Sequence, residues 1–349
     1  MKIGIAKRFL ALVGAISTAA GGYTWYWHYA ADQVRDGVPA FQEAARAEGY
    51  AVNLSEPQIS GYPYRIVVAF GAAEVAPLSD GPRQGGKSRN WVIKLDDLVG
   101  YAQPWNLSHA IFDFGAGATV TWNGVDYVGS ADSALMSLTF VDDLPQRLST
   151  DVTGLNVNAP STGAVFSAQR AQFHLERQIS RGLERDYFRV SLSTDELAVP
   201  EGLRRTFVHL APEISQMHGS GTLVNRGAIS ASTSDMIAQD WLLKLSDLSV
   251  KWSPIEIRGT GELSLDGKRR PQGSIHARSR GHEAIVDSLE TTGVLSTRKA
   301  VATKTALELL RTSSNDDDGD DRLMPINIDM QGGRLYLGPV KLMKVQPLW

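Results

Sequence analysis

The chain has 349 residues, of which 43% are hydrophobic and 21% are charged, a composition that is ordinary for a folded globular protein. Its formal net charge of −3 disfavours nucleic acid as a partner. The absence of cysteine excludes disulfides, thiolate nucleophiles and cysteine metal sites.

An apolar run near the N-terminus predicts the compartment. Lys7 and Arg8 precede residues 9–27, which contain no charged side chain. As a helix this run would span about 28 Å, close to the ~30 Å of a bilayer's hydrocarbon core. We predict a membrane anchor or signal segment at residues 1–30, with a single transmembrane helix in the inner membrane, a cytoplasmic N-terminus and a periplasmic body. The alternative is a secretory signal cleaved near residues 17–20, which releases the same body into the periplasm.

A second helical pattern follows the apolar run. Val34, Val38, Phe41 and Ala45 recur at helical spacing among charged residues, and the pattern stops at Gly49. We expect an amphipathic helix that leads away from the membrane and caps the first sheet.

Strand patterns dominate the rest of the chain, and the clearest is a hairpin. The Asn123-Gly124 pair fits a two-residue type I′ turn, which needs positive φ at both central positions. This turn pairs Trp122 with Val125 and Val120 with Tyr127 on one apolar face.

Other segments alternate apolar and polar residues in the same way, and their apolar positions are Leu155 and Val157, Phe173 and Leu175, Phe188, Val190 and Leu192, Ile255 and Ile257, Leu263 and Leu265, and Ile326, Ile328 and Met330 facing Leu335 and Leu337. These patterns predict a mainly β fold, with antiparallel meander sheets that form an elongated groove or a sandwich, together with a few helices.

A short sequence echo divides the body. Residues 95–98 (Leu-Asp-Asp-Leu) precede a Pro-Trp pair, and residues 245–248 (Leu-Ser-Asp-Leu) precede Trp-Ser-Pro. We therefore predict a β-rich first half at residues 31–200 and a β-rich second half at 201–349, the second carrying a helical insert at 283–312.

Catalytic and metal-binding motifs are absent from the sequence. The histidines form no His-Glu-x-x-His pair, and no nucleotide-binding glycine motif is present. His218-Gly-Ser-Gly221 superficially resembles a nucleophile turn, but we interpret it as an ordinary turn. The aspartate-rich run at 316–321 fails as an EF-hand, because Pro325 occupies the position that needs a bidentate glutamate. We predict no enzyme activity, no metal and no cofactor.

Several segments together resemble the domain of unknown function 2125 family. Gly61, Tyr62, Pro63, Tyr64 and Arg65 form a Gly-aromatic-Pro-aromatic-Arg signature that is similar to that of the family. The segments 261–267 (Gly-Glu-Leu-Ser-Leu-Asp-Gly) and 271–275 (Pro-Gln-Gly-Ser-Ile) resemble its later hairpin, and residues 333–339 resemble its C-terminal strand pair. The hairpins more distantly resemble those of AsmA-like envelope proteins, which implies elongated β-grooves that carry lipid between membranes. This chain is far shorter than the large AsmA-like proteins.

The sequence therefore favours a membrane-anchored envelope protein that binds or transfers phospholipid or another lipid in an apolar β-groove. The candidate groove residues are Val120, Trp122, Val125, Tyr127, Leu263, Leu265, Leu335 and Leu337. Two alternatives stay open, because a groove and a sealed core need the same alternation. One is a non-catalytic β-sandwich scaffold, and the other is a glycan- or peptidoglycan-binding module that uses aromatic side chains such as Tyr62, Tyr64, Trp105 and Trp122.

Overall fold

The computed structural model describes residues 5–78, 91–178, 187–225, 241–313 and 323–347, apart from 143, 162 and 339. Its helices are α1 (Ile5–Ala47), α2 (Glu201–Thr206), α4 (Glu283–Thr291) and α5 (Thr297–Ser313). The strands of the first half are β1 (Tyr50–Leu54), β2 (Gln58–Ser60), β3 (Ile66–Pro77), β4 (Trp91–Gln103), β5 (Asn106–Asp113), β6 (Gly117–Trp122), β7 (Val125–Ser130), β8 (Ser133–Val141) and β9 (Leu144–Ala159). The strands that follow are β10 (Ala164–Gln178), β11 (Tyr187–Ala198), β12 (Glu213–Asn225), β13 (Trp241–Trp252), β14 (Ile255–Leu265), β15 (Pro271–Arg280), β16 (Met324–Gln331), β17 (Arg334–Leu337) and β18 (Val340–Lys344).

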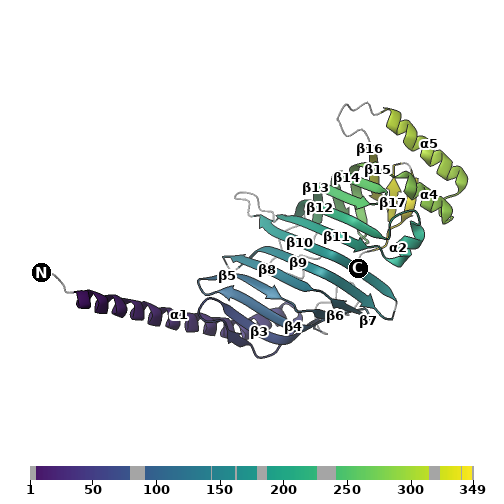
Figure 1. Cartoon of the computed structure of the whole chain (residues 1–349). Coiled ribbons are helices and arrows are strands. Elements are labelled where there is room, and N and C mark those ends of the chain that lie inside the picture. The colour runs from purple at the N-terminus through teal and green to yellow at the C-terminus, as the bar shows by residue number, and fades with distance from the viewer. Residues whose placement is uncertain are drawn as a thin grey trace.

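All of these strands belong to one 18-stranded sheet, and every described pairing is antiparallel. The short strands β1 and β2 both pair with β3, and β4 pairs along its length with β5 and β6. Strands β8 and β7 continue to β9, and from β9 onward each strand pairs with the next in sequence. The mainly β, antiparallel prediction is confirmed. A sandwich would need two sheets, whereas Figure 1 shows an elongated, twisted sheet.

Alternation gives this sheet one apolar and one polar face. Cross-strand partners share a face, so the register traces continuous rows of side chains from β3 to β17. One apolar row is Val68, Gly100, Phe112, Met136, Thr150, Phe173, Leu192, Gly219, Leu248, Gly259, Ala277 and Ile326. The next row is Ile66, Ala102, Ala110, Leu138, Leu148, Leu175, Val190, Gly221, Leu245, Gly261, Ile275, Ile328 and Leu337.

The helices in the described part of the chain form buried clusters with the apolar face at the two ends of the sheet. At the β3 end, Trp27, Ala30 and Ala31 of α1 form a buried cluster with Ile66 and Val68. At the other end, side chains of α4 and α5 pack on β13 to β17, and the central residues of this second cluster are Ile275, Ala277, Val286, Leu289, Leu295, Ala300, Met324, Ile326 and Leu337. These helices occupy most of residues 283–312.

The N-terminal helix differs from the prediction of two helical segments. Residues Ile5–Ala47 form one continuous helix, about 65 Å long. Its second part packs Val34 and Val38 against the sheet, so the predicted cap on the first sheet is confirmed. Within the described residues, no helix combines the length and the apolarity needed to cross a membrane. The physical reason is that glycine, serine, threonine and aromatic residues with polar atoms fill much of residues 14–28.

The β6–β7 hairpin forms as predicted. Asn123 and Gly124 have φ values of 50° and 80°, as a type I′ turn requires. Trp122 faces Val125 and Val120 faces Tyr127, while Thr121 donates a hydrogen bond of 2.7 Å to Asp126 on the other face. The β16–β17 pairing of Ile328 with Leu337 and Met330 with Leu335 also agrees with the sequence.

The sequence echo lies on two strands that have the same irregularity. In β4, pairing with the following strands breaks between Leu95 and Val99, and in β13 it breaks between Leu245 and Leu248. The two strands also share the pattern Trp-x-x-Lys-Leu-x-Asp-Leu, which extends the echo N-terminally. At each break, two leucines lie three positions apart, and an exposed aspartate, Asp97 or Asp247, lies between them.

One motif was interpreted wrongly. Residues 218–221 lie inside β12, where Gly219 and Gly221 belong to the apolar rows, so they are not a turn. A side chain at Gly221 would place its Cβ 2.3 Å from the Lys244 carbonyl oxygen of β13, which explains the glycine by close strand approach. The aspartate-rich run at 316–321 lies outside the described residues.

Candidate functional site

The middle of the sheet presents apolar side chains that lie outside the clusters formed by the described helices. We define the open apolar face by the row residues of five successive strands, and these are Ala110 and Phe112, Met136 and Leu138, Leu148 and Thr150, Phe173 and Leu175, and Val190 and Leu192. All ten are half-buried or exposed, and none belongs to the clusters beneath the helices. Leu192 is 43% exposed. The two clusters in which the described helices pack on the sheet include no residue of these five strands.

The dimensions of this face suit an extended hydrocarbon chain. Strands are spaced about 4.8 Å apart, so the rows cross β5, β8, β9, β10 and β11 over roughly 19 Å. One leaflet of a bilayer's hydrocarbon core is about 15 Å thick, so an acyl chain laid along a row would fit on the open apolar face.

The opposite face of the same strands is polar and charged. Arg147 and Arg189 donate hydrogen bonds of 3.0 and 3.1 Å to the two oxygens of Glu176, and Arg170 pairs with Asp151 at 2.6 Å. Arg147, followed by Arg189, holds the pKa of Glu176 below its usual value. This face is therefore stable in water, whereas the apolar face leaves hydrocarbon exposed.

The protein's total accessible surface reflects this open architecture. It is 21706 Å² for a mass of 37.9 kDa, whereas compact monomers of that mass expose about 14,000 Å². Part of the excess lies on the open apolar face, and part on the N-terminal half of α1. Residues 7–22 of α1 are all exposed or nearly so, and Figure 1 shows this part of the helix extending away from the sheet.

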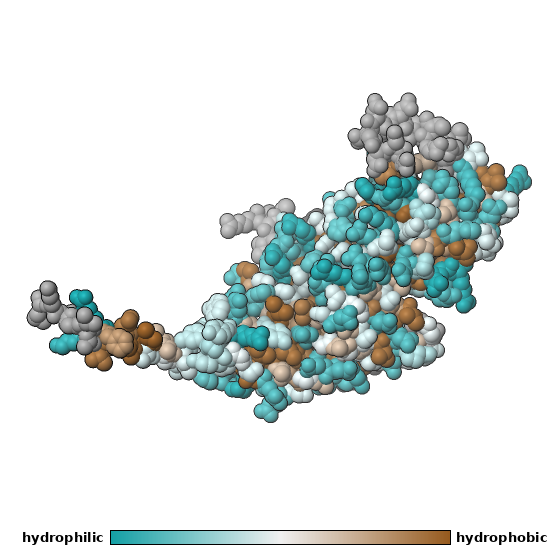
Figure 2. Space-filling view, viewed as in Figure 1, coloured by the Kyte–Doolittle hydropathy of each residue, from teal (hydrophilic) through white to brown (hydrophobic). Residues whose placement is uncertain are grey.

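Hydrophobic side chains surround that projecting part of α1. Phe9, Leu10, Leu12 and Ile16 are each at least 58% exposed, and Figure 2 shows hydrophobic residues around the free end of the helix. Large apolar side chains on an uncharged helix are normally buried, in a protein core or at a membrane surface.

The signature at residues 61–65 is the socket that holds α1 on the sheet. Tyr23 donates a hydrogen bond to the Pro63 carbonyl, and Trp27 Nε1 donates one of 3.2 Å to the Arg65 carbonyl. The Tyr62 ring meets the Trp27 ring edge-on at 5.5 Å. Gly61 adopts a φ of +100°, and a Cβ there would lie 2.6 Å from the Arg65 carbonyl oxygen. The tight turn therefore needs glycine.

The remaining signature side chains support this structural role. The Arg65 guanidinium lies 5.7 Å from the centre of the Tyr101 ring. Tyr64 makes no packed contact among the clusters and is 78% exposed.

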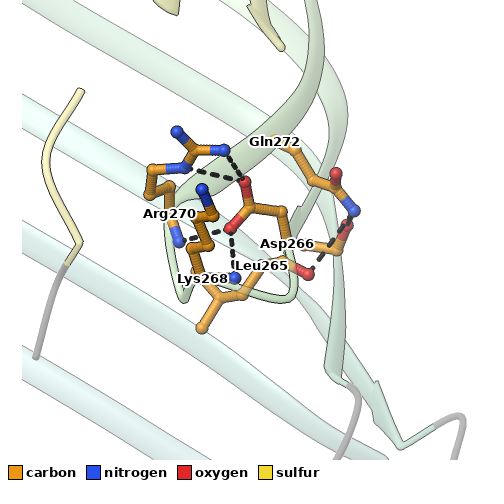
Figure 3. A network of polar contacts seen from close by, with 6 residues as sticks. Leu265, Asp266, Lys268, Arg270 and Gln272 are labelled. Atoms are coloured by element: carbon orange, nitrogen blue, oxygen red, sulfur yellow. Dashed lines mark hydrogen bonds and ion pairs between the residues drawn. The ribbon is translucent and has the colours of Figure 1, made fainter. Parts of the chain in front are cut away.

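The later family-like hairpin is held by one carboxylate, as Figure 3 shows. Asp266 Oδ1 accepts hydrogen bonds from the backbone N–H groups of Lys268 at 2.8 Å and Arg270 at 3.0 Å, and Oδ2 accepts one of 2.8 Å from Arg270 Nε. The Arg270 side chain first, and the two backbone donors after it, lower the pKa of Asp266 from 3.8 to about 2. This network fixes the turn between β14 and β15.

We expect Asp266→Asn to lower the thermal midpoint at neutral pH, because the ion pair with Arg270 is lost. The folded pKa lies below the unfolded value, so the carboxylate stabilises the fold above about pH 3.8 and this contribution disappears as pH falls towards 2. The gap between wild type and variant, measured by calorimetry across this range, should narrow with acidification. A gap of constant size would contradict the assignment. Glu262→Gln on β14, the strand that leads into this turn, is the control, since its ion-pair partner Lys244 is 4.0 Å away and both are exposed.

The structure does not bring the predicted groove residues together. Val120, Trp122, Val125 and Tyr127 line the β6–β7 hairpin, whereas the four leucines lie on β14 and β17 at the other end of the sheet. Leu263 and Leu337 pack in the cluster with α4 and α5, so they are core residues and do not line an open face. Leu265 and Leu335 are half-buried near that end. The open apolar face was missed as a site, although Phe173, Leu175, Val190 and Leu192 had been recognised as alternating positions.

A hollow on the polar face is the main alternative site. It has a volume of about 670 Å³ and is lined by polar residues that include Arg258, His276 and Asn327. Arg258 is already paired with buried Glu256 at 2.6 Å, and the same carboxylate also pairs with Arg280, so one negative charge is shared between two guanidinium groups. Among the described residues, no three His, Asp or Glu side chains are placed to hold a metal ion.

Comparison with known proteins agrees with the sequence resemblance. None of the curated proteins compared with the chain is significantly similar to it. The family described as "Uncharacterized protein conserved in bacteria (DUF2125)" matches residues 27–346, a range that begins at the buried Trp27 and includes the 61–65 socket and the Asp266 hairpin. The chain belongs to this family.

Proposed function

We propose that the protein binds lipid on the open apolar face, and passes it on, while the N-terminal half of α1 attaches it to a membrane. The observation that carries this proposal is the pair of apolar rows on β5 and β8 to β11, which lie outside both clusters that the described helices form with the sheet. Acyl chains lying along these rows would gain about 0.8 kcal/mol for each buried methylene. The role is one of binding, not of catalysis.

The membrane side of the proposal rests on α1. Residues 9–22 carry no charge and extend from the sheet with exposed apolar side chains, so insertion into a bilayer would bury them. Lys7 and Arg8 precede this segment, and we propose on the strength of these charges an N-terminus in the cytoplasm and a body in the periplasm at the inner membrane, although α1 falls short of the apolarity of an ordinary membrane-spanning helix. Signal cleavage, with release of the body into the periplasm, remains the alternative arrangement.

Site-specific photocrosslinking of the full chain in cells tests the lipid proposal. A benzoylphenylalanine probe replaces Phe173 on the open apolar face, and the same probe replaces Gln172, its neighbour on the polar face. We expect position 173 to crosslink to lipid, detected by mass spectrometry, and position 172 to remain unlinked.

Two outcomes would contradict lipid binding. If position 173 crosslinks to a protein, the open apolar face is a scaffold surface, which is the second role considered from the sequence. If neither position crosslinks to lipid, the face does not carry lipid in the cell.

A further inference from the structure

Exposed aromatic rings gather where α1 meets the sheet. Three segments that are distant in sequence come together there, namely residues 23–31 of α1, the 61–65 turn and the 103–106 turn between β4 and β5. Tyr26 donates a hydrogen bond of 2.8 Å to the Pro104 carbonyl, next to Trp105, and Thr24 and Tyr62 share one of 2.7 Å. These contacts fix the three segments to one another.

We name the exposed rings of these segments the aromatic collar, and they are Trp25, Tyr29, Tyr62, Tyr64 and Trp105. Trp25 is 70% exposed, Tyr64 is 78% exposed and Trp105 is 60% exposed. Trp25 and Tyr29 stack with ring centres 5.8 Å apart, which leaves both rings at the surface. The polar parts of Tyr and Trp favour the headgroup region of a bilayer, and their rings favour the acyl boundary.

The charge of this region also suits a membrane surface. In residues 23–31, 61–65 and 103–106, Arg65 is the only residue that carries a formal charge at neutral pH. No acidic side chain in these segments opposes contact with lipid phosphates. The collar also continues directly from the apolar residues 9–22 of α1, so helix and collar form one surface.

We propose that the aromatic collar docks in the interface of the bilayer, so that Tyr64 and Trp105 of the β-body touch lipid as well as the helix. This inference rests on the proposed membrane attachment of α1 and goes beyond it. Because the hydrogen bonds between α1 and the 61–65 turn fix the angle between helix and sheet, docking places the β4–β5 turn at the membrane surface. The open apolar face begins at β5, so it would start beside the bilayer, where lipid enters.

Environment-sensitive labelling tests this docking, and the lack of native cysteine makes single-cysteine variants direct. The full chain is reconstituted in vesicles of phosphatidylethanolamine and phosphatidylglycerol, with a nitrobenzoxadiazole label on Tyr64→Cys or Trp105→Cys. Ile16→Cys reports helix insertion, and Val301→Cys on α5, which is 58% exposed, reports a site distant from the collar.

At positions 64 and 105 we expect blue-shifted emission and quenching by lipids that carry a spin label near the headgroup. At position 16 we expect quenching by lipids that carry the spin label deep in the acyl chain. The emission at position 301 should not change when vesicles are added. If position 16 is protected while 64 and 105 behave like 301, the collar does not dock, although α1 still attaches the protein to the membrane. If position 16 is also unprotected, both the docking and the membrane attachment fail.

Discussion

We expect Leu192→Asp to remove most of the lipid that co-purifies with the full-length protein and Ser193→Asp to leave that lipid bound. The two positions are neighbours on β11 that point to opposite faces of the sheet. Leu192 belongs to the open apolar face and is paired there with Phe173, while Ser193 lies on the polar face opposite Gln172. Both variants therefore add the same charge to the same strand, but only the aspartate at position 192 would contact the proposed lipid.

The expected effect on lipid is large because a carboxylate in contact with acyl chains loses its hydration. The cost of bringing a charged group into an apolar environment is several kcal/mol, and each 1.4 kcal/mol lowers affinity tenfold. We therefore expect at least about a tenfold loss of bound lipid for Leu192→Asp. Native mass spectrometry after purification in a mild detergent, with lipid extraction as a second readout, measures the difference.

The fold itself should tolerate both changes. Leu192 is 43% exposed, so the new carboxylate stays in contact with water when no lipid is bound. Thermal midpoints close to that of the wild type for both variants establish that the comparison is valid. Equal lipid occupancy in the two variants would show that the open apolar face does not hold the lipid.

The sequence predicted the alternation of individual strands well, because a period of two is a local property. The hairpin at Asn123-Gly124 and the β16–β17 register follow directly from turn chemistry and apolar pattern. The spacing of Phe188, Val190 and Leu192 also indicated one apolar face on β11.

The sequence could not predict which part of the apolar face is open. A strand beneath a helix and an uncovered strand show the same alternation of apolar and polar residues. Leu337 and Leu192 look alike in sequence, yet Leu337 is 5% exposed and Leu192 is 43% exposed. The difference comes from Val286 and Leu289 of α4 and Ala300 of α5, which pack on the last strands of the sheet. Their position depends on tertiary packing that no local pattern encodes.

For a related reason, the sequence could not predict that α1 is continuous or that the 61–65 turn contacts it. The apolar run and the amphipathic pattern indicated two helical segments, and only contacts to the sheet show that one helix connects them. Trp27 is the residue at which the two patterns meet, and its burial against Ile66 and Val68 depends on a turn more than thirty positions away in the chain. The glycine, the proline and the two tyrosines of this turn indicated that the segment is structurally constrained, but they did not indicate which element it holds.

We expect Trp27→Ala to weaken the packing of α1 on the sheet by about 3–5 kcal/mol of free energy, the range measured for removing a large aromatic side chain from a core. Trp27 is 5% exposed, packs between Ala30, Ala31 and the β3 side chains, and donates its indole N–H to the Arg65 carbonyl. Hydrogen exchange measured by mass spectrometry should show faster exchange in residues 27–47 and in the 61–65 turn, with the distant α4 region unchanged.

Trp25→Ala is the matched control, since it removes the same side chain two positions away on the same helix. Trp25 is 70% exposed and makes its ring contact with Tyr29, so we expect exchange in residues 27–47 to stay at the wild-type rate. Trp27→Phe separates packing from hydrogen bonding, because it keeps a ring in the cluster and removes the donor to the Arg65 carbonyl. A buried acceptor that loses its partner costs about 1–3 kcal/mol, so the phenylalanine variant should lie between wild type and alanine. Equal exchange in the Trp25 and Trp27 alanine variants would show that the 61–65 turn is not what holds the helix.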